Sequence, residues 1–424
     1  MRKWLKQAGI ALLCPVFLSG CGTEEAEVLT QQEVEEIRIP VTFRVEPTTN
    51  VAENQDFAEN FNAEYKGTYQ LDVEWLTENA AGYRNKLKQW NVLDEMPAII
   101  TDAGFDNDFY ELLVENDRLV DLRPYMEKSD FWMDAMNPDI LADSTEEDGS
   151  IYLSPLGSSV WSYAGLLYNT DLLEEAGYEG IPQTWDEFFV CLEMLKDAGI
   201  TPLALHGSGS YWVPMLISTA YIYRTEEGKA FLGEEFPETF QNDSMRELLE
   251  IFQKLYQYTF EDAVDLEYEQ ASSRFLNGEA AIFANGYWMF SGISSAMREK
   301  LVFEPFPGNL LMNSSRMTAW AVTAGYDEEI TEGAVEALAY RIQSEQESRE
   351  AALAEPIGNR LEDSYIEAVR EPENIMPNYQ MKWEQEIQNE FFTGYLPKLL
   401  DGTLEIDGFL ELLDARNEEI RMKK

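Results

Sequence analysis

Aromatic side chains that could stack on a ring-shaped ligand follow the end of a predicted strand at two places in the chain. At the first, residues 274–288, a helix closes at Gly278, in the position of a C-cap, and residues 280–283 are apolar and strand-like. A turn signal then begins at Asn285 and is followed by Trp288. Because ligands of open α/β sheets bind beyond the strand ends, we predict that Asn285 and Trp288 contact a ligand. The alternative is that Trp288 packs in the core.

The second place follows a helix whose start is clearly marked. Thr184 and Glu187 have the spacing of a capping box, and residues 201–205 after the helix indicate a buried strand. Tyr211 and Trp212 come shortly after the end of that strand. We predict that these two rings also stack on ligand, with packing at the start of the next helix as the alternative.

The first of these segments, residues 275–288, resembles the signature segment of the family 1 extracellular solute-binding proteins. These are maltose-binding-protein-like carbohydrate-binding lipoproteins that serve ABC importers. Residues 151–169 and 171–207 resemble further parts of that family, and the resemblance extends over essentially all of residues 37–424. It implies a two-lobed periplasmic-binding-protein-like α/β fold, in which each lobe is a mainly parallel sheet flanked by helices and hinge crossings join the lobes.

The alternation of apolar and polar residues agrees with such a fold in the first part of the chain. Residues 37–45 and 69–75 alternate as half-buried strands, residues 97–101 are apolar, and helical patterns separate them. This order favours right-handed crossovers and a mainly parallel sheet. With the crossings that the resemblance implies, we expect lobe I over residues 37–155 plus 306–355 and lobe II over residues 156–305 plus 356–424.

The N-terminal residues have the pattern of an export signal. A basic start precedes an apolar run that is too short to span a bilayer, so we expect residues 1–20 to be a cleaved signal peptide. The following Cys21 completes a sequence similar to a bacterial lipobox, which implies lipidation of Cys21 and attachment to the extracellular face of the cell membrane. Residues 21–36 are rich in Glu and have no core-forming pattern, so they read as an acidic tether.

The family resemblance and the polar character of sugars add further candidate residues. A sugar presents apolar C–H faces, which aromatic rings cover, and hydroxyls, which carboxylates and amides bind. Near the implied hinge and at predicted strand ends, the residues of these types are Trp161, Tyr163, Trp320, Glu46 and Asp102. Glu46 and Asp102 could instead cap helices.

The composition excludes several other functions. A formal net charge of −48 argues against nucleic acid as a partner, because phosphate binding needs a basic surface. The chain has a single histidine, His206, which weakens His-based metal sites and Ser-His or Cys-His catalysis, and we expect a structural role for it. Cys191 reads as a small buried hydrophobe. We expect no cofactor and no metal.

From these observations we expect a monomeric, non-enzymatic, lipid-anchored component of an ABC transporter that captures a sugar or oligosaccharide between two lobes. Its partners would be the carbohydrate and the permease subunits, with the membrane contacted only through the lipid on Cys21. No Gly-x-x-x-x-Gly-Lys-Ser/Thr run occurs, so this chain does not supply the ATPase. Two alternatives remain open: an exported glycoside hydrolase, and a sugar-sensing lipoprotein that partners a membrane kinase.

Overall fold

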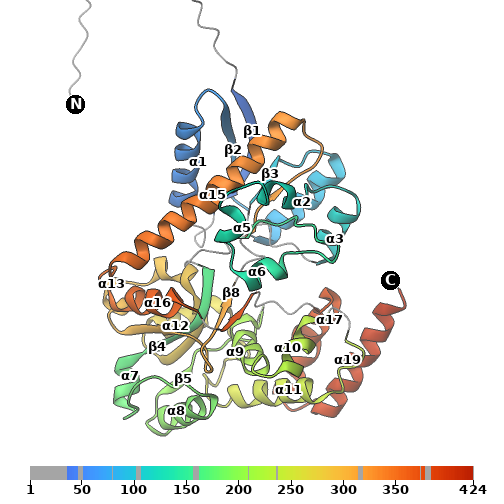
Figure 1. Ribbon diagram of the computed structural model, residues 1–424. Helices are drawn as coiled ribbons and strands as arrows, with labels where there is room; N and C mark the ends of the chain where they lie inside the picture. The colour runs from blue at the N-terminus through green and yellow to red at the C-terminus, as the bar shows by residue number, and fades with distance from the viewer. Residues whose placement is uncertain are drawn as a thin grey trace, which may run out of the picture. The chain divides into compact units, whose positions relative to one another are not determined.

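The strands of the chain form two sheets, each with helices beside it (Figure 1). The computed structural model describes residues 36–45, 51–78, 80–101, 107–155, 162–208, 210–234, 237–313, 319–372, 374–377 and 383–423. Glu46, Asp102, Trp161 and Cys21, which the sequence predicted as binding or lipidation sites, lie outside these residues.

The first sheet has the strand order β2-β1-β3-β9 and is mainly parallel, as expected. Its strands are β1 (Ile37–Arg44), β2 (Tyr69–Leu76), β3 (Ile99–Ile100) and β9 (Ala321–Val322). Both β2 and β3 pair with β1 in parallel, and β9 adds an antiparallel edge. The predicted alternation along β1 is confirmed, because Ile39, Val41 and Phe43 are fully buried.

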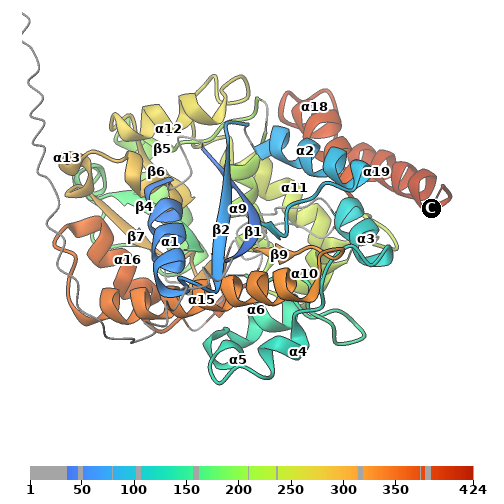
Figure 2. The same ribbon diagram turned by 90° about the horizontal axis from the view of Figure 1, so that it is seen from above.

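Helices cover both faces of this sheet. Figure 2 shows α1 (Val51–Glu64) and α15 (Glu328–Ala354) beside β2 and β1, where Phe43, Phe61 and Trp320 belong to one core. The other face is covered by α2 (Ala80–Leu93), whose Tyr83 and Leu87 belong to a second, smaller core. The remaining helices of this region are α3 (Asn107–Glu115), α4 (Arg123–Met126), α5 (Trp132–Ala135) and α6 (Pro138–Asp143).

The second sheet has the order β10-β8-β4-β6-β5, with β7 paired to β4. Its strands are β4 (Tyr163–Asn169), β5 (Thr201–Leu203), β6 (Ala280–Gly286), β7 (Leu301–Glu304), β8 (Leu310–Asn313) and β10 (Asn374–Met376). We expected a mainly parallel sheet, but this one is mixed: β4 pairs antiparallel with β6, β7 and β8. Parallel pairs are found between β5 and β6 and between β8 and β10.

The helices around the second sheet build the largest hydrophobic core of the described residues. The predicted capping box is confirmed at α8 (Trp185–Asp197), where the Thr184 hydroxyl accepts from the backbone N–H of Glu187. The other helices are α7 (Thr170–Glu175), α9 (Trp212–Ile222), α10 (Glu226–Gly233), α11 (Asp243–Leu255), α12 (Tyr268–Leu276), the 3₁₀ helix η2 (Tyr287–Gly292), α13 (Ser295–Arg298), α16 (Arg360–Arg370), α17 (Gln385–Asn389), the π-helix η3 (Glu390–Tyr395), α18 (Leu396–Leu400) and α19 (Ile406–Arg421). Within this core, α8 holds Cys191, which is fully buried, and burial raises the pKa of its thiol to about 12.

The chain returns to the first sheet later than the expected position at residue 306. Strand β8 pairs with β4 and β10, and Phe306 packs in the core of the second sheet, so residues 306–313 go with that sheet. Pairing with the first sheet resumes at β9. The reason is local: after β7 the chain turns at Asn309, which has a φ of 56°, and β8 continues in the same sheet.

Among the described residues, none of the helices combines the length and the apolar character that crossing a membrane requires.

Candidate ligand-binding site

The two segments predicted to carry ligand-stacking rings meet at one edge of the second sheet. Strands β5 and β6 are parallel neighbours, with Thr201 opposite Ala280 and Leu203 opposite Ile282. Since their carboxyl ends lie at the same edge, the chain leaves both strands on the same side of the sheet. From β5 it continues through His206 to α9, and from β6 it passes directly into η2.

Three half-buried rings come together at this edge, and we call Trp212, Tyr268 and Trp288 the aromatic cluster. The ring centroids of Trp212 and Trp288 are 5.9 Å apart, with the ring planes tilted by 40°. Tyr268, the first residue of α12, lies 6.1 Å from Trp212 on the same centroid measure. Rings that are neither fully buried nor fully exposed can pack on the protein with one part and meet a ligand with another.

Asn285 supports this cluster from within β6. Its side chain is fully buried, and its Nδ2 donates a hydrogen bond of 2.9 Å to the hydroxyl of Tyr268. Its Oδ1 accepts from the backbone N–H of Gly286 at 2.8 Å. In this arrangement Asn285 orients Tyr268, and a direct contact of Asn285 with ligand stays a prediction.

Tyr268 was not among the residues predicted from sequence. It stands alone at a helix start, away from the paired aromatics that marked Trp212 and Trp288. Only the pairing of α12 with β6 in space brings it to the site. The local signal that could have found it is the capping pattern of Glu267 and Gln270, which fixes Tyr268 at the first position of α12.

His206 lies beside the cluster, fully buried. Its Nε2 accepts from the backbone N–H of Val213 at 3.4 Å, and its carbonyl accepts from the Tyr256 hydroxyl at 2.5 Å. Its ring meets Tyr268 edge-on, with centroids 5.8 Å apart. Burial lowers the pKa of His206 to about 4, so the imidazole is neutral at pH 7. These contacts fit the structural role expected from the sequence.

Charges from both sheet regions act on the Tyr287 hydroxyl. Burial, together with the charges of Glu362, Glu53 and Glu345 and opposed by that of Arg298, raises the pKa of this hydroxyl to about 12. Glu53 belongs to α1 and Glu345 to α15, the helices beside the first sheet.

Three other predicted residues lie away from the aromatic cluster, in hydrophobic cores. Tyr211 is 4% exposed and stacks on Phe392 at a centroid distance of 6.2 Å. Tyr163 begins β4 inside the same core, and its backbone N–H donates to the Tyr365 hydroxyl at 3.2 Å. Trp320 is 2% exposed in the core of the first sheet. For Tyr211, the arrangement is the helix-start packing that the sequence left open.

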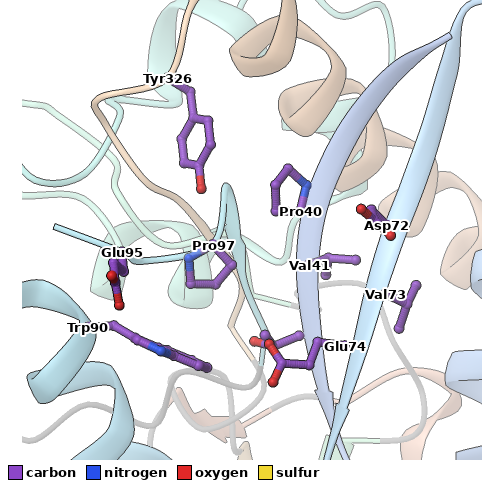
Figure 3. Close-up of a pocket in the computed structure, with 10 residues that line it drawn as sticks. Pro40, Val41, Asp72, Val73, Glu74, Trp90, Glu95, Pro97 and Tyr326 are labelled. Atoms are coloured by element: carbon purple, nitrogen blue, oxygen red, sulfur yellow. The ribbon is translucent and has the colours of Figure 1, made fainter. Parts of the chain in front are cut away.

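A separate hollow of about 350 Å³ lies on the first sheet, and Figure 3 shows it between the strand residues and the ring of Trp90. Its lining includes the carboxylates of Asp72, Glu74 and Glu95. The first two carboxylates already form ion pairs with cationic side chains of the protein: Arg38 lies 3.7 Å from Asp72, and Lys86 lies 3.7 Å from Glu74. Of the predicted ligand-binding residues that the structure describes, none lines this hollow. Within the described part of the chain, no group of His, Cys, Asp and Glu side chains could hold a metal ion.

Two sheets with helices beside them and aromatic rings at the strand ends are the features of two-lobed α/β binding proteins. The chain belongs to the bacterial extracellular solute-binding proteins, since the model of that family matches residues 56–359. This agrees with the family resemblance found in the sequence.

Relatives with curated descriptions match part of the chain. A probable sugar-binding periplasmic protein of Rhizobium meliloti is 28% identical over 159 residues, which are 37% of this chain and 37% of that protein. A probable sugar-binding periplasmic protein of Brucella suis is 28% identical over 154 residues, or 36% of this chain and 35% of that protein. The match therefore spans little more than a third of the length of each relative.

Solved structures match nearly the whole chain. A chitin oligosaccharide binding protein has a TM-score of 0.68 and 19% identity, covering 91% of this chain and 98% of that one. The sugar-binding protein MalE from Xanthomonas citri has a TM-score of 0.69 and 16% identity, with the same coverage. At these identities the likeness shows the two-lobed fold.

Replacing Trp320 with Ala tests whether this residue belongs to the core. We expect Trp320→Ala to lower the free energy of unfolding by about 3–5 kcal/mol, because a fully buried indole is removed and a cavity remains. Urea unfolding measures the change. The matched variant Trp75→Ala removes an indole that is 38% exposed on the same sheet and should cost less than half as much. Equal, small losses in both variants would contradict the core assignment of Trp320.

His206 predicts a pH dependence of stability. Its pKa falls from 6.5 to about 4 on folding, so between these values the unfolded chain binds a proton that the folded chain does not. The free energy of unfolding therefore decreases as the pH is lowered through this window, and the contribution of His206 is complete above pH 6.5. We expect wild type to lose about 1–2 kcal/mol more between pH 7 and pH 5 than His206→Gln.

The measurement is urea unfolding of both proteins at a series of pH values. The carboxylates titrate in both proteins, so the difference between the two curves isolates residue 206. Parallel curves would show that the folded protein does not depress the pKa of His206.

Proposed function

We propose that this chain is the extracellular, lipid-anchored substrate-binding component of an ABC transporter, which captures a sugar or oligosaccharide and delivers it to a membrane permease. The observation that carries the proposal is the aromatic cluster at the carboxyl ends of β5 and β6. The family assignment supports solute capture in general. The similar proteins described as binding sugars or a chitin oligosaccharide support a carbohydrate as the solute.

The chemistry of the cluster favours a sugar over an ion or an amino acid. Indole rings offer broad apolar faces that match the C–H faces of a pyranose. The arginines of α12 and α13 already have carboxylate partners: Arg298 forms an ion pair with Glu362, and Arg274 forms a two-pronged pair with Asp262 at 2.7 Å. Trp212 and Trp288 are the residues we propose as the stacking surface, with Tyr268 held behind them by Asn285.

Closure of the two lobes would complete the site. Ligand held by the aromatic cluster would gain contacts from the first-lobe helices, of which α1 and α15 carry Glu53 and Glu345, whose charges act on the Tyr287 hydroxyl. A ligand that contacts both lobes shifts the open–closed equilibrium by its extra affinity for the closed form, which a permease can recognise. We propose lobe I as residues 37–155 with the return segment through α15, and lobe II as the second sheet with residues 356–424. The lipobox-like sequence at Cys21 supports attachment to the outer face of the membrane.

A thermal-shift screen of the chain without residues 1–21 tests the proposal. The panel contains monosaccharides, oligosaccharides, amino acids and polyamines. Ligand at a hundredfold excess over its dissociation constant adds roughly 2.7 kcal/mol to the free energy of unfolding, which a melting curve resolves. We expect stabilisation by one class of sugar and expect Trp288→Ala to weaken its binding by about 1–3 kcal/mol with the fold intact.

The control for this variant is Trp185→Ala, which removes a half-buried indole at the start of α8 that packs on Phe188 and Tyr221 and should leave binding unchanged. A response to amino acids or polyamines with none to sugars would keep the binding-protein assignment and reject carbohydrate. Release of reducing ends from an oligosaccharide would overturn the proposal in favour of a glycoside hydrolase.

A further inference from the structure

Gly286 lies directly under the indole of Trp288. Its backbone is extended, with φ −124° and ψ 179°, so the conformation itself does not require glycine. The space does: a Cβ on residue 286 would overlap three carbons of the six-membered ring of Trp288. The indole therefore folds back over the end of β6, in the volume that any side chain at 286 would fill.

This position brings the Trp288 indole against Trp212. Their centroids are 5.9 Å apart. A ligand ring inserted between two aromatic faces needs about 7–8 Å, which is twice the optimal carbon–carbon separation. The two indoles thus cannot hold a sugar ring between them, so a sugar can stack only on their outer, uncovered parts, which we call the joined surface.

We infer that Gly286 is the positioning residue that leaves room for Trp288 to pack against Trp212, and that the joined surface selects ligands with two or more linked sugar rings over the corresponding monosaccharide. The inference rests on the proposed function and specifies its substrate class.

Calorimetric titration with matched saccharide series tests the inference. The probes are glucose, maltose and maltotriose; N-acetylglucosamine and its dimer and trimer; and xylose, xylobiose and xylotriose. In the series that binds, we expect wild type to bind the dimer or trimer at least tenfold more tightly than the monomer, because a second stacked ring adds about 1.4 kcal/mol, which is the equivalent of tenfold.

The matched pair of variants is Gly286→Ala and Gly292→Ala. Gly286 directly precedes η2 and Gly292 is its last residue, but a Cβ on Gly292 would meet no atom within 4 Å. We expect Gly286→Ala to lower the affinity for the longer ligand to near the affinity for the monomer. We also expect it to change the tryptophan fluorescence. Gly292→Ala should leave both unchanged.

A double variant separates positioning from general destabilisation. In a Trp288→Ala background the indole is gone, so adding Gly286→Ala should change the affinity no further. If Gly286→Ala alone does not fold but the double variant does, the overlap with the indole is the cause and the inference stands.

Two results would overturn the inference while leaving the proposed function in place. One is a wild-type protein that binds monomer and oligomer equally. The other is a Gly286→Ala variant that keeps the full preference. If the wild type bound none of the sugars, the proposed function would be rejected, and the inference with it.

Discussion

The parallel register of β5 with β6 is the constraint on which the candidate site depends. With Thr201 opposite Ala280, the two strands end at one edge, and the segments after them have to share the same space. Trp212 at the start of α9 and Trp288 in η2 become neighbours for this reason, although they are far apart in the chain. A slip of one residue would turn the side chains of β6 to the opposite face of the sheet and separate Asn285 from Tyr268.

The same residue types build the core and the site, and their surroundings decide which role they take. Trp320 and Trp288 both lie next to a strand: Trp320 directly precedes β9, and Trp288 follows β6. Trp320 is enclosed by Phe43, Phe57 and the guanidinium of Arg341, 4.1 Å from its ring, whereas Trp288 is left half-buried beside Trp212. An aromatic residue at a strand end is therefore a candidate for ligand contact only if the neighbouring elements leave part of its ring uncovered.

This difference explains how much the sequence could predict. Local patterns were sufficient for the capping box at Thr184, for the C-cap at Gly278, which has a φ of 79°, and for the delivery of Trp212 and Trp288 to strand ends. Local patterns could not indicate that β8 joins the second sheet, because strand partners are chosen by tertiary packing. Nor could they separate buried Tyr211 from half-buried Trp212 one residue later, since Phe392 covers Tyr211 from a distant part of the chain.

Because Cys191 is buried, cysteines introduced elsewhere in the protein can be labelled selectively through their thiols. From residue 22 onward Cys191 is the only cysteine of the chain, and its thiol is enclosed in the core under α8 with a pKa of about 12. Maleimides react with exposed thiolates, so this residue gives no background labelling in the folded protein. A cysteine introduced on each lobe could therefore carry a pair of dyes, and the distance between them would report lobe closure in a single molecule.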